Sequence, residues 1–342
     1  MSSGNSRREA TLIRGDGIGP EITQATLDVL DAIGVQFQWD EQVAGMAAVD
    51  RTGTPLPDAT MDSIKRTKLA LKGPLTTPVG GGYRSVNVAL RQEFDLYANV
   101  RPTKSIVPGG KFEHVDLVIV RENTEGLYVG LDYTFRVGGD RRAMAQAMSI
   151  VTREGSDRVV RFAFEYAKTH HRKKVTVVHK ANILKATSGL FLESAKHVAK
   201  QYEGLIASDD KIVDNCAMQL VIKPEQFDVI VTTNLFGDIL SDEAAGLVGG
   251  LGLAPGANIG THAAIFEAVH GSAPDIAGQG IANPTALMLG AAMMLDHVGE
   301  LDAALRLRGA IETVIAKDGI RTKDLGGSAS TAEFARAVAR RA

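Results

Sequence analysis

Continuous apolar runs of strand length alternate along the chain with segments of helical periodicity. Three of these runs share one scheme, an apolar strand followed at once by polar residues: "VDLVIVREN" (115–123), "KVTVVHKAN" (174–182) and "FDVIVTTNLFGD" (227–238). Strands that are apolar throughout are buried on both faces, as in a mainly parallel sheet. The pattern therefore predicts an α/β fold in which strands and helices alternate.

The N-terminal part of the chain follows the same alternation. "TLIRGDG" (11–17) predicts a first strand and a turn, and Pro20 opens a helix that ends at Gly34. "KLALKGP" (68–74) predicts another strand, which the loop "GGGYRS" (80–85) follows. The turn "GDGIGPEI" (15–22) is not a dinucleotide fingerprint, because Pro20 replaces the last glycine of G-x-G-x-x-G. We interpret it as a tight strand-to-helix turn.

The segment 131–153 departs from this alternation. Its sequence, "LDYTFRVGGDRRAMAQAMSIVTR", predicts two strands around a Gly-Gly-Asp turn. A two-stranded hairpin is only marginally stable in water. It therefore needs a partner, either its own domain or the same hairpin of a second subunit.

Composition and charge exclude several classes of protein. The chain has 342 residues and a net charge of −2, so it carries no basic surface of the kind that binds nucleic acid or anionic membranes. Cys216 is the only cysteine, which excludes a disulfide framework and indicates a reducing, cytoplasmic compartment. The first ten residues are polar, unlike a secretory signal. The apolar run 286–295 is too short to span a bilayer.

Polar residues stand just past the three buried strands, where open α/β sheets bind ligands. They are Arg121, Lys180 and Asn234, with Asp238 one helical turn further on. If the three strands are neighbours, cationic and acidic side chains share one crevice.

Asp238 and Asp242 lie four residues apart, so both carboxylates are on one face of a helix. One interpretation is that they interact with the helix dipole in a first turn, or form a solvated face. The other is that they bind Mg²⁺ or Mn²⁺, since hard divalent cations prefer carboxylate oxygens. Asp214 would be a third ligand, although alone it is an ordinary loop aspartate.

Other residues are candidates for substrate binding and proton transfer. Arg91, Arg101 and Arg121 would clamp carboxylates through bidentate hydrogen bonds, unless they are surface arginines lying over apolar neighbours. Ser85 is an N-cap or an anion ligand at the start of its helix. Tyr128 and Lys180 are the candidates for proton transfer. The alternatives are ordinary packing for Tyr128 and a strand-end role for Lys180.

The best nucleotide candidate is the segment "IFEAVHGSAPDIAGQGIANP" (265–284). A strand-like start leads into a loop rich in small residues with one imidazole, His270. Small residues let a backbone approach a pyrophosphate closely. An irregular surface loop is the alternative.

Together these segments resemble the metal-dependent β-decarboxylating dehydrogenases, the isocitrate and isopropylmalate dehydrogenase family. The resemblance covers essentially the whole chain and rests on "GPLTTPVGGGYRSVNVALRQ", "LYANVRP", "VIVRENTEGLYVG", "HKANILK", "NLFGDILSDEAAG" and "EAVHGSAPDIAG". It implies the isopropylmalate dehydrogenase-like, non-Rossmann fold. The expected large domain comprises residues 1–98 and 249–342, and the small domain residues 99–248, with a clasp hairpin at about 131–153 in a homodimer.

Within this family, "RSVNVALRQ" (84–92) resembles the isocitrate branch. The resemblance then implies oxidative decarboxylation of isocitrate to 2-oxoglutarate, a step of the tricarboxylic acid cycle. Homoisocitrate or 3-isopropylmalate dehydrogenation, or a regulatory subunit, are the alternatives. The implied substrate-binding residues are Ser85, Asn87, Arg91, Arg101 and Arg121.

The resemblance also implies the remaining ligands. Asp214, Asp238 and Asp242 would hold the metal, with Asp214 and Lys180 supplied by the other subunit. Tyr128 and Lys180 would be catalytic. NAD is expected rather than NADP, because Asp275 and Ile276 stand where NADP-using relatives carry Lys and Tyr. The implied cofactor-binding residues are Thr77, Glu267, His270, Gly271, Ala273, Asp275, Ile276 and Asn283.

Overall fold

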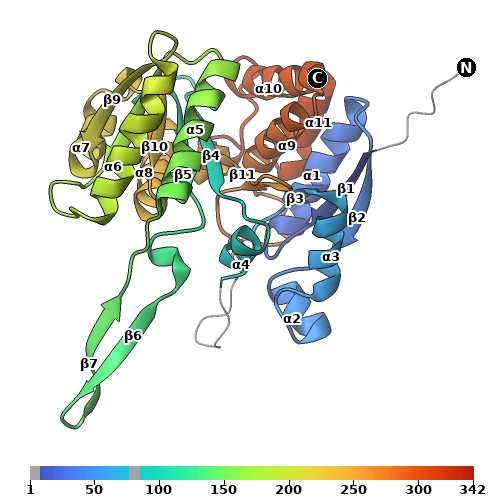
Figure 1. The fold of residues 1–342 in the computed structure, drawn as a ribbon. Coiled ribbons are helices and arrows are strands. Elements are labelled where there is room, and N and C mark those ends of the chain that lie inside the picture. The colour runs from blue at the N-terminus through green and yellow to red at the C-terminus, as the bar shows by residue number, and fades with distance from the viewer. Residues whose placement is uncertain (1–7, 77–84) are drawn as a thin grey trace, which may run out of the picture. The chain divides into compact units, whose positions relative to one another are not determined.

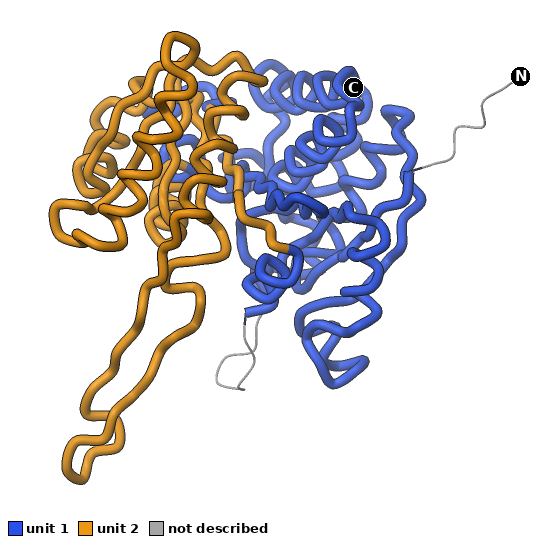
Figure 2. Tube along the Cα trace, viewed as in Figure 1, with its two compact units in different colours: residues 1–94, 105–113, 245–342 blue, residues 95–104, 114–244 orange. Residues whose placement is uncertain are grey.

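A computed structural model of the protein describes residues 8–76 and 85–342 (Figure 1). Contacts divide the chain into two compact units, coloured in Figure 2. Unit 1 comprises residues 1–94, 105–113 and 245–342, and unit 2 comprises residues 95–104 and 114–244. The predicted loop 80–85 and the candidate Thr77 lie outside the described residues, apart from Ser85.

Unit 1 contains a sheet in the order β2-β1-β3-β12-β11. Its first four strands run parallel, and β11 pairs antiparallel with β12. The strands are β1 Arg8–Ile13, β2 Phe37–Gln42, β3 Leu69–Lys72, β11 Pro255–Ile259 and β12 Ala264–Ala268. The part of the sheet in unit 1 is therefore mainly parallel.

Helices cover this sheet. α3 packs against β1, β2 and β3, while α9 packs against β3, β11 and β12 and is itself covered by α1 and α10. The α9 segment contains the longest apolar run, and most of its residues are buried, so the run forms core. The helices are α1 Gly19–Ala32, α2 Met46–Thr52, α3 Asp58–Thr67, α4 Val86–Glu93, α9 Thr285–His297, α10 Leu301–Ala316 and α11 Thr331–Arg341, with short turns η4 Leu251–Leu253 and η5 Lys323–Leu325.

The "GDGIGPEI" segment is the tight turn that the sequence predicted. Gly15 and Gly17 have φ of +84° and +58°, which favour glycine. A Cβ on Gly17 would come within 2.0 Å of the Ser272 carbonyl oxygen, so the turn packs directly against the 270–280 loop. The Asp16 carboxylate accepts hydrogen bonds from the backbone of Met46, Ala47 and Thr76.

Unit 2 contains a second sheet segment in the order β4-β5-β10-β8-β9. β5, β10, β8 and β9 are parallel, and β4 is antiparallel to β5. α5 packs against β5, β8 and β10, and α6 packs against α5 and β8. The elements are β4 Ala98–Lys104, β5 Asp116–Glu122, η1 Leu127–Val129, α5 Arg153–Thr169, β8 Lys174–His179, α6 Thr187–Ala199, η2 Lys200–Tyr202, β9 Ala207–Ile212, α7 Val213–Ile222, η3 Pro224–Gln226, β10 Val229–Thr232 and α8 Asn234–Val248, whose last residues belong to unit 1.

The predicted hairpin is present in unit 2. β6 Asp132–Val137 and β7 Asp140–Ala147 pair antiparallel (Figure 1). Every residue of both strands is exposed in the single chain. The exposed residues include Tyr133, Phe135, Val137 and Met144. The interpretation that the hairpin packs on its own domain is therefore wrong.

No helix among the described residues combines the length and the hydropathy needed to cross a bilayer.

Candidate active site

The three strands that end in polar residues are neighbours. β10 lies between β5 and β8, and all three run parallel, with Thr232 in register with both Arg121 and Val178. Their carboxyl ends therefore meet at one edge of the unit 2 sheet. Asn234 and Lys180 follow the strands at that edge, as the sequence predicted, whereas Arg121 is the second-last residue of β5 itself rather than a residue past its end.

Two arginines of this edge converge on one carboxylate. Arg121 Nη1 donates to Asp238 Oδ1, and Arg101 Nη2 lies 3.4 Å from the same oxygen. Arg101 Nη1 also donates to Ser241 Oγ at 2.6 Å and to Asp242 Oδ1 at 3.2 Å. Both guanidinium groups are buried, so the interpretation of Arg101 and Arg121 as surface arginines is wrong.

The two aspartates lie on one face of α8. The helix begins at Asn234, which places Asp238 in the second turn rather than the first, so the proposed interaction with the dipole of a first turn is wrong. Burial raises the pKa of Asp242, the neighbouring Asp238 raises it further, and Arg101 opposes both. The two carboxylates together therefore form a site of negative charge on α8.

Tyr128 reaches the same carboxylate. Its hydroxyl donates to Asp238 Oδ2 at 2.5 Å, and the Arg121 guanidinium lies 4.9 Å from the centroid of its ring. Burial raises the pKa of Tyr128, and the hydrogen bond to Asp238 raises it further. The phenol is thus protonated at neutral pH and can donate a proton.

Lys180 and Asp214 form a separate pair in this chain. Lys180 Nζ donates to Asp214 Oδ1, and this hydrogen bond lowers the pKa of Asp214. Across residues 8–76 and 85–342, no three His, Cys, Asp or Glu side chains are grouped so that they could hold a metal ion. A single chain therefore brings Asp238 and Asp242 together but leaves Asp214 outside their cluster.

A buried charged cluster occupies the unit 1 sheet. Glu267, at 5% exposure, pairs with Lys72 Nζ at 2.8 Å and accepts a hydrogen bond from Asn258 at 2.7 Å. Arg91, also buried, lies 3.8 Å from Glu267. Burial alone would raise the pKa of Glu267, but Lys72 and Arg91 lower it to about 2. The predicted residues Arg91 and Glu267 are thus brought together.

Two residues of this cluster, Lys72 and Asn258, were not predicted from the sequence. The signal for Lys72 was its position inside the otherwise apolar strand "KLALKGP", since lysine is almost never fully buried unless it is paired. No such signal marks Asn258.

Replacing Lys72 by Met should destabilise the protein by about 3 to 5 kcal/mol at neutral pH, because the Glu267 charge would stay buried without its partner. The folded pKa of about 2 lies below the ordinary value of 4.5. The stabilisation is therefore present above pH 4.5 and is lost as the pH falls towards 2. Urea unfolding at neutral pH and at about pH 3 should show a smaller deficit at the acidic pH.

A matched variant tests the same pair. Lys72→Met combined with Glu267→Gln removes both charges and should recover most of the lost stability. A deficit that is the same at both pH values, or no recovery in the double variant, would contradict the assigned pairing.

Ser85 and Asn87 stand at the start of α4. Ser85 occupies the N-cap position, but its side chain makes no capping hydrogen bond, so the interpretation of Ser85 as a capping side chain is wrong. Asn87 Oδ1 is buried without a hydrogen-bond partner among the described residues. Its unmet acceptor fits a ligand that supplies a donor.

The loop after β12 carries the other predicted cofactor residues. His270 Nδ1 lies 2.9 Å from the Gly271 carbonyl oxygen, so this nitrogen carries the proton. Its Nε2 is then an acceptor, buried and without a partner in the part of the chain that the structure describes. Burial lowers the pKa of His270, which keeps the imidazole neutral. Ala273 has φ of +40°, a left-handed turn residue.

The remaining residues of this loop differ in accessibility. Asp275 is exposed and Ile276 is half-buried, which leaves the Asp275 carboxylate accessible to a ligand. Asn283 donates to Asp324 Oδ2 at 3.0 Å and accepts from the Thr285 backbone at 3.0 Å. Asp324, which was not predicted from the sequence, thereby joins the candidate set.

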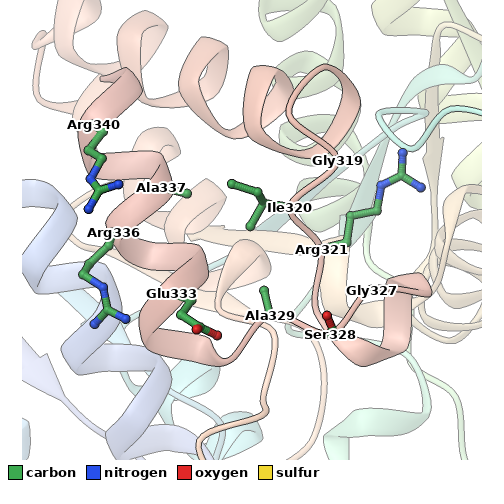
Figure 3. Close-up of a pocket in the computed structure, with 10 residues that line it drawn as sticks. All are labelled: Gly319, Ile320, Arg321, Gly327, Ser328, Ala329, Glu333, Arg336, Ala337 and Arg340. Carbon is green, nitrogen blue, oxygen red and sulfur yellow. The ribbon is translucent and has the colours of Figure 1, made fainter.

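A separate cavity in unit 1, of about 610 Å³, lies between residues 319–329 and α11. Figure 3 shows Arg336 and Arg340 side by side on α11, whereas Arg321 extends to the opposite side of the cavity. The three guanidinium groups do not converge, and none of the predicted site residues lines this cavity.

Comparison with known proteins defines the class. The family model described as isocitrate/isopropylmalate dehydrogenase matches residues 9–338, and the chain belongs to this family. The predicted α/β fold of the isopropylmalate dehydrogenase type is thereby confirmed, together with the resemblance on which it rested.

Particular relatives narrow the comparison. The chain is 48% identical to isocitrate dehydrogenase [NAD] catalytic subunit 5, mitochondrial, of Arabidopsis thaliana, over 96% of this chain and 87% of that protein. It is 51% identical to the isocitrate/homoisocitrate dehydrogenase of Thermus thermophilus, over 96% of each. A crystal structure of isocitrate dehydrogenase from Methylococcus capsulatus is 59% identical, with a TM-score of 0.94, over 98% of this chain and 99% of that one.

Proposed function

We propose that the protein is a metal-dependent isocitrate dehydrogenase that uses NAD. The observation that carries this proposal is the convergence of Arg101, Arg121 and the Tyr128 hydroxyl on the Asp238 carboxylate. Such a centre binds carboxylates and supplies a proton beside a site for a cation. The NAD-dependent isocitrate dehydrogenases among the relatives support this assignment.

The arginines and the helix α4 residues would bind the three carboxylates of isocitrate. Arg91, Arg101 and Arg121 are buried, and an arginine fork matches a carboxylate through two parallel hydrogen bonds. Ser85 and Asn87 would meet the carboxylate that 3-isopropylmalate lacks. Asn87 Oδ1, which has no protein partner among the described residues, would take a hydroxyl or water as donor.

The donor set of α8 fits a hard divalent cation. Asp238 and Asp242 present carboxylate oxygens on one helical face, which suit Mg²⁺ or Mn²⁺. We infer that Asp214 of a second subunit completes the set. When bound, the cation would act as a Lewis acid on the substrate oxygens.

The unit 1 loop fits a dinucleotide. His270 Nε2 is a neutral, buried acceptor with no partner among the described residues, and exposed Asp275 suits ribose hydroxyls while repelling a 2′-phosphate. Gly271, Ala273, Glu267 and Asn283 lie in or beside the same segment. NAD, when bound, would accept the hydride from C2 of isocitrate.

The protein's own part in the chemistry is proton transfer. We infer that Lys180 Nζ removes the proton of the C2 hydroxyl. Oxidation leaves a 2-oxo acid whose β-carboxylate departs as carbon dioxide. Tyr128 Oη, whose raised pKa keeps it protonated, then returns a proton to the carbon that lost carbon dioxide, giving 2-oxoglutarate.

We propose a homodimer with shared active sites. Apolar side chains are exposed in unit 2 on the hairpin, on α7 at Met218 and Ile222, and on α8 at Ile239. An exposed apolar surface of this kind is typical of an interface. A partner subunit would also bring a second Lys180–Asp214 pair to the α8 aspartates.

A turnover assay on the purified chain tests the function. Isocitrate, homoisocitrate and 3-isopropylmalate would be compared, each with NAD and with NADP, in the presence of Mg²⁺. Isocitrate with NAD should give the highest kcat/KM. Homoisocitrate is the second candidate, because the Thermus thermophilus relative is named for both substrates and one methylene contributes only about 1–3 kcal/mol of discrimination. No NADH formation with any substrate would favour a regulatory subunit.

Asp275→Lys combined with Ile276→Tyr should shift cofactor preference towards NADP. The lysine replaces a carboxylate that repels the 2′-phosphate with a cation that attracts it, and both positions are accessible. The measurement is the ratio of kcat/KM for NAD to that for NADP, which should fall by about tenfold or more. Asp302→Lys on the exposed start of α10 is a control for the charge change. An unaltered ratio in the double variant would remove both residues from the ribose site.

A further inference from the structure

Asn234 connects the arginine clamp to the loop that carries Tyr128. It is the first residue of α8 and is 0% exposed. Its Oδ1 accepts two hydrogen bonds from Arg121, from Nε at 3.0 Å and from Nη2 at 2.7 Å. Its Nδ2 donates to the Glu125 carbonyl oxygen at 3.1 Å.

The chemistry of the neighbours fixes the orientation of this amide. A guanidinium group has only donors and a backbone carbonyl has only acceptors. The Asn234 oxygen must therefore face Arg121, and its NH₂ group must face Glu125. A flipped amide would oppose donor to donor on one side and acceptor to acceptor on the other.

These contacts immobilise Arg121. The Nε–H and one N–H of Nη2 are occupied by Asn234, so the Nη1 end is directed at Asp238. The aliphatic stem is held as well, because a Cβ on Gly237 would lie 2.6 Å from Arg121 Cβ. Arg121 can thus offer a ligand only the edge that Asn234 leaves.

The Glu125 contact reaches the Tyr128 loop. The buried Glu122 carboxylate accepts hydrogen bonds from the backbone of Thr124 and Glu125, which fixes the start of this loop. Asn234 fixes its middle at Glu125, three residues before Tyr128. The Tyr128 ring then packs on the Arg121 guanidinium, which closes a ring of contacts back to Asn234.

We propose that Asn234 is a positioning residue that couples the orientation of Arg121 to the placement of the Tyr128 hydroxyl. Asn99 offers a comparison, since it is also buried and its Oδ1 accepts from Arg101 Nε at 2.7 Å. Asn99 orients the other arginine, whereas Asn234 holds an arginine and the proton donor's loop together. This inference rests on the proposed function, in which Tyr128 protonates the product.

Asn234→Asp separates the two contacts. A carboxylate keeps an acceptor for Arg121 but sets an oxygen against the Glu125 carbonyl, so the loop loses its donor. We expect kcat with isocitrate and NAD to fall about tenfold or more, while KM for isocitrate changes less than about threefold. Binding of NADH to the free protein, followed by fluorescence, should stay unchanged.

A double-mutant cycle distinguishes positioning from a general structural effect. In a Tyr128→Phe background, Asn234→Asp should lower kcat less than about threefold further, because the donor it places is gone. For the matched control, Asn99→Asp, the fold-reduction in kcat should multiply with that caused by Tyr128→Phe. The proposal would be overturned if the effects of Asn234→Asp and Tyr128→Phe on kcat multiplied as well. A wild-type kcat in the Asn234→Asp variant alone would also overturn it.

A stability cycle keeps the inference independent of turnover. Asn234→Ala and Arg121→Lys should have non-additive effects on the unfolding midpoint, since each removes the same contacts. Additive effects would overturn the coupling between these residues. A wild-type protein that forms no NADH from isocitrate would instead overturn the proposed function, and the stability cycle would still decide the role of Asn234.

Discussion

Lys180→Met and Tyr128→Phe are each expected to lower kcat for isocitrate oxidation by about 100- to 10,000-fold, the range that general acid–base groups contribute. The methionine cannot accept the hydroxyl proton, and the phenylalanine cannot return one to carbon. Neither change removes an arginine from the substrate clamp, so KM for isocitrate should change much less than kcat. Initial rates of NADH formation at saturating Mg²⁺ measure both parameters.

Two conservative controls match these changes. Lys185→Met alters an exposed lysine five residues beyond Lys180, and Tyr166→Phe removes a phenol from α5. Both should retain turnover within about threefold of the wild type. An equal fall in kcat for the controls, or a large rise in KM without loss of kcat for the two site variants, would contradict the assigned proton transfers.

Mixing the two inactive variants tests the shared active site. If Lys180 and Tyr128 of one site come from different subunits, a hybrid dimer has one site with both residues intact. Random exchange of equal amounts should then restore about a quarter of wild-type turnover. Verified subunit exchange without recovery would show that each site is built within one chain.

The sequence was sufficient to predict which strands bring their polar residues to one edge of the unit 2 sheet. The largely apolar strands at 117–120, 175–178 and 229–231 are typical of a buried parallel sheet, in which polar residues at the strand ends meet at one edge. The structure places β5, β10 and β8 side by side, so Arg121 and Asp238 come into contact although they are 117 residues apart. The helical spacing of Asp238 and Asp242 likewise followed from local geometry alone.

The features of the site that could not be predicted from the sequence depend on contacts between segments that are distant along the chain. Lys72 pairs with Glu267, and Asn258 completes the pair, only because β3, β12 and β11 lie next to one another. The Asn234 side chain, at the start of α8, is likewise held by Arg121 and by the Glu125 carbonyl, which are distant from it in the sequence. Ser85 has the residue type of an N-cap, yet its hydroxyl makes no such bond.

Asp238→Asn is expected to raise the Mg²⁺ concentration needed for half-maximal activity by at least about 10- to 100-fold. Alterations of residues that only support metal ligands already have effects of that size. The substitution is isosteric, but it replaces a charged oxygen donor with a neutral amide, and half of that amide is a nitrogen that a hard cation disfavours. It also removes the anion on which Arg101 and Arg121 converge, so the site gains positive charge that opposes a divalent cation.

The loss can be measured without turnover. Titration of the protein with Mn²⁺, followed by the electron paramagnetic resonance signal of the free ion, should show the same weakening with substrate present or absent. Glu243→Gln provides the matched control, because it removes one charge from the next turn of α8 and leaves Asp238 and Asp242 in place. The Glu243 carboxylate is half-buried, and burial raises its pKa. That variant should bind Mn²⁺ within about threefold of the wild type. If instead Asp238→Asn keeps the wild-type dependence on Mg²⁺ and the wild-type Mn²⁺ titration, then Asp238 is only the counter-ion of Arg121, and the cation must bind elsewhere.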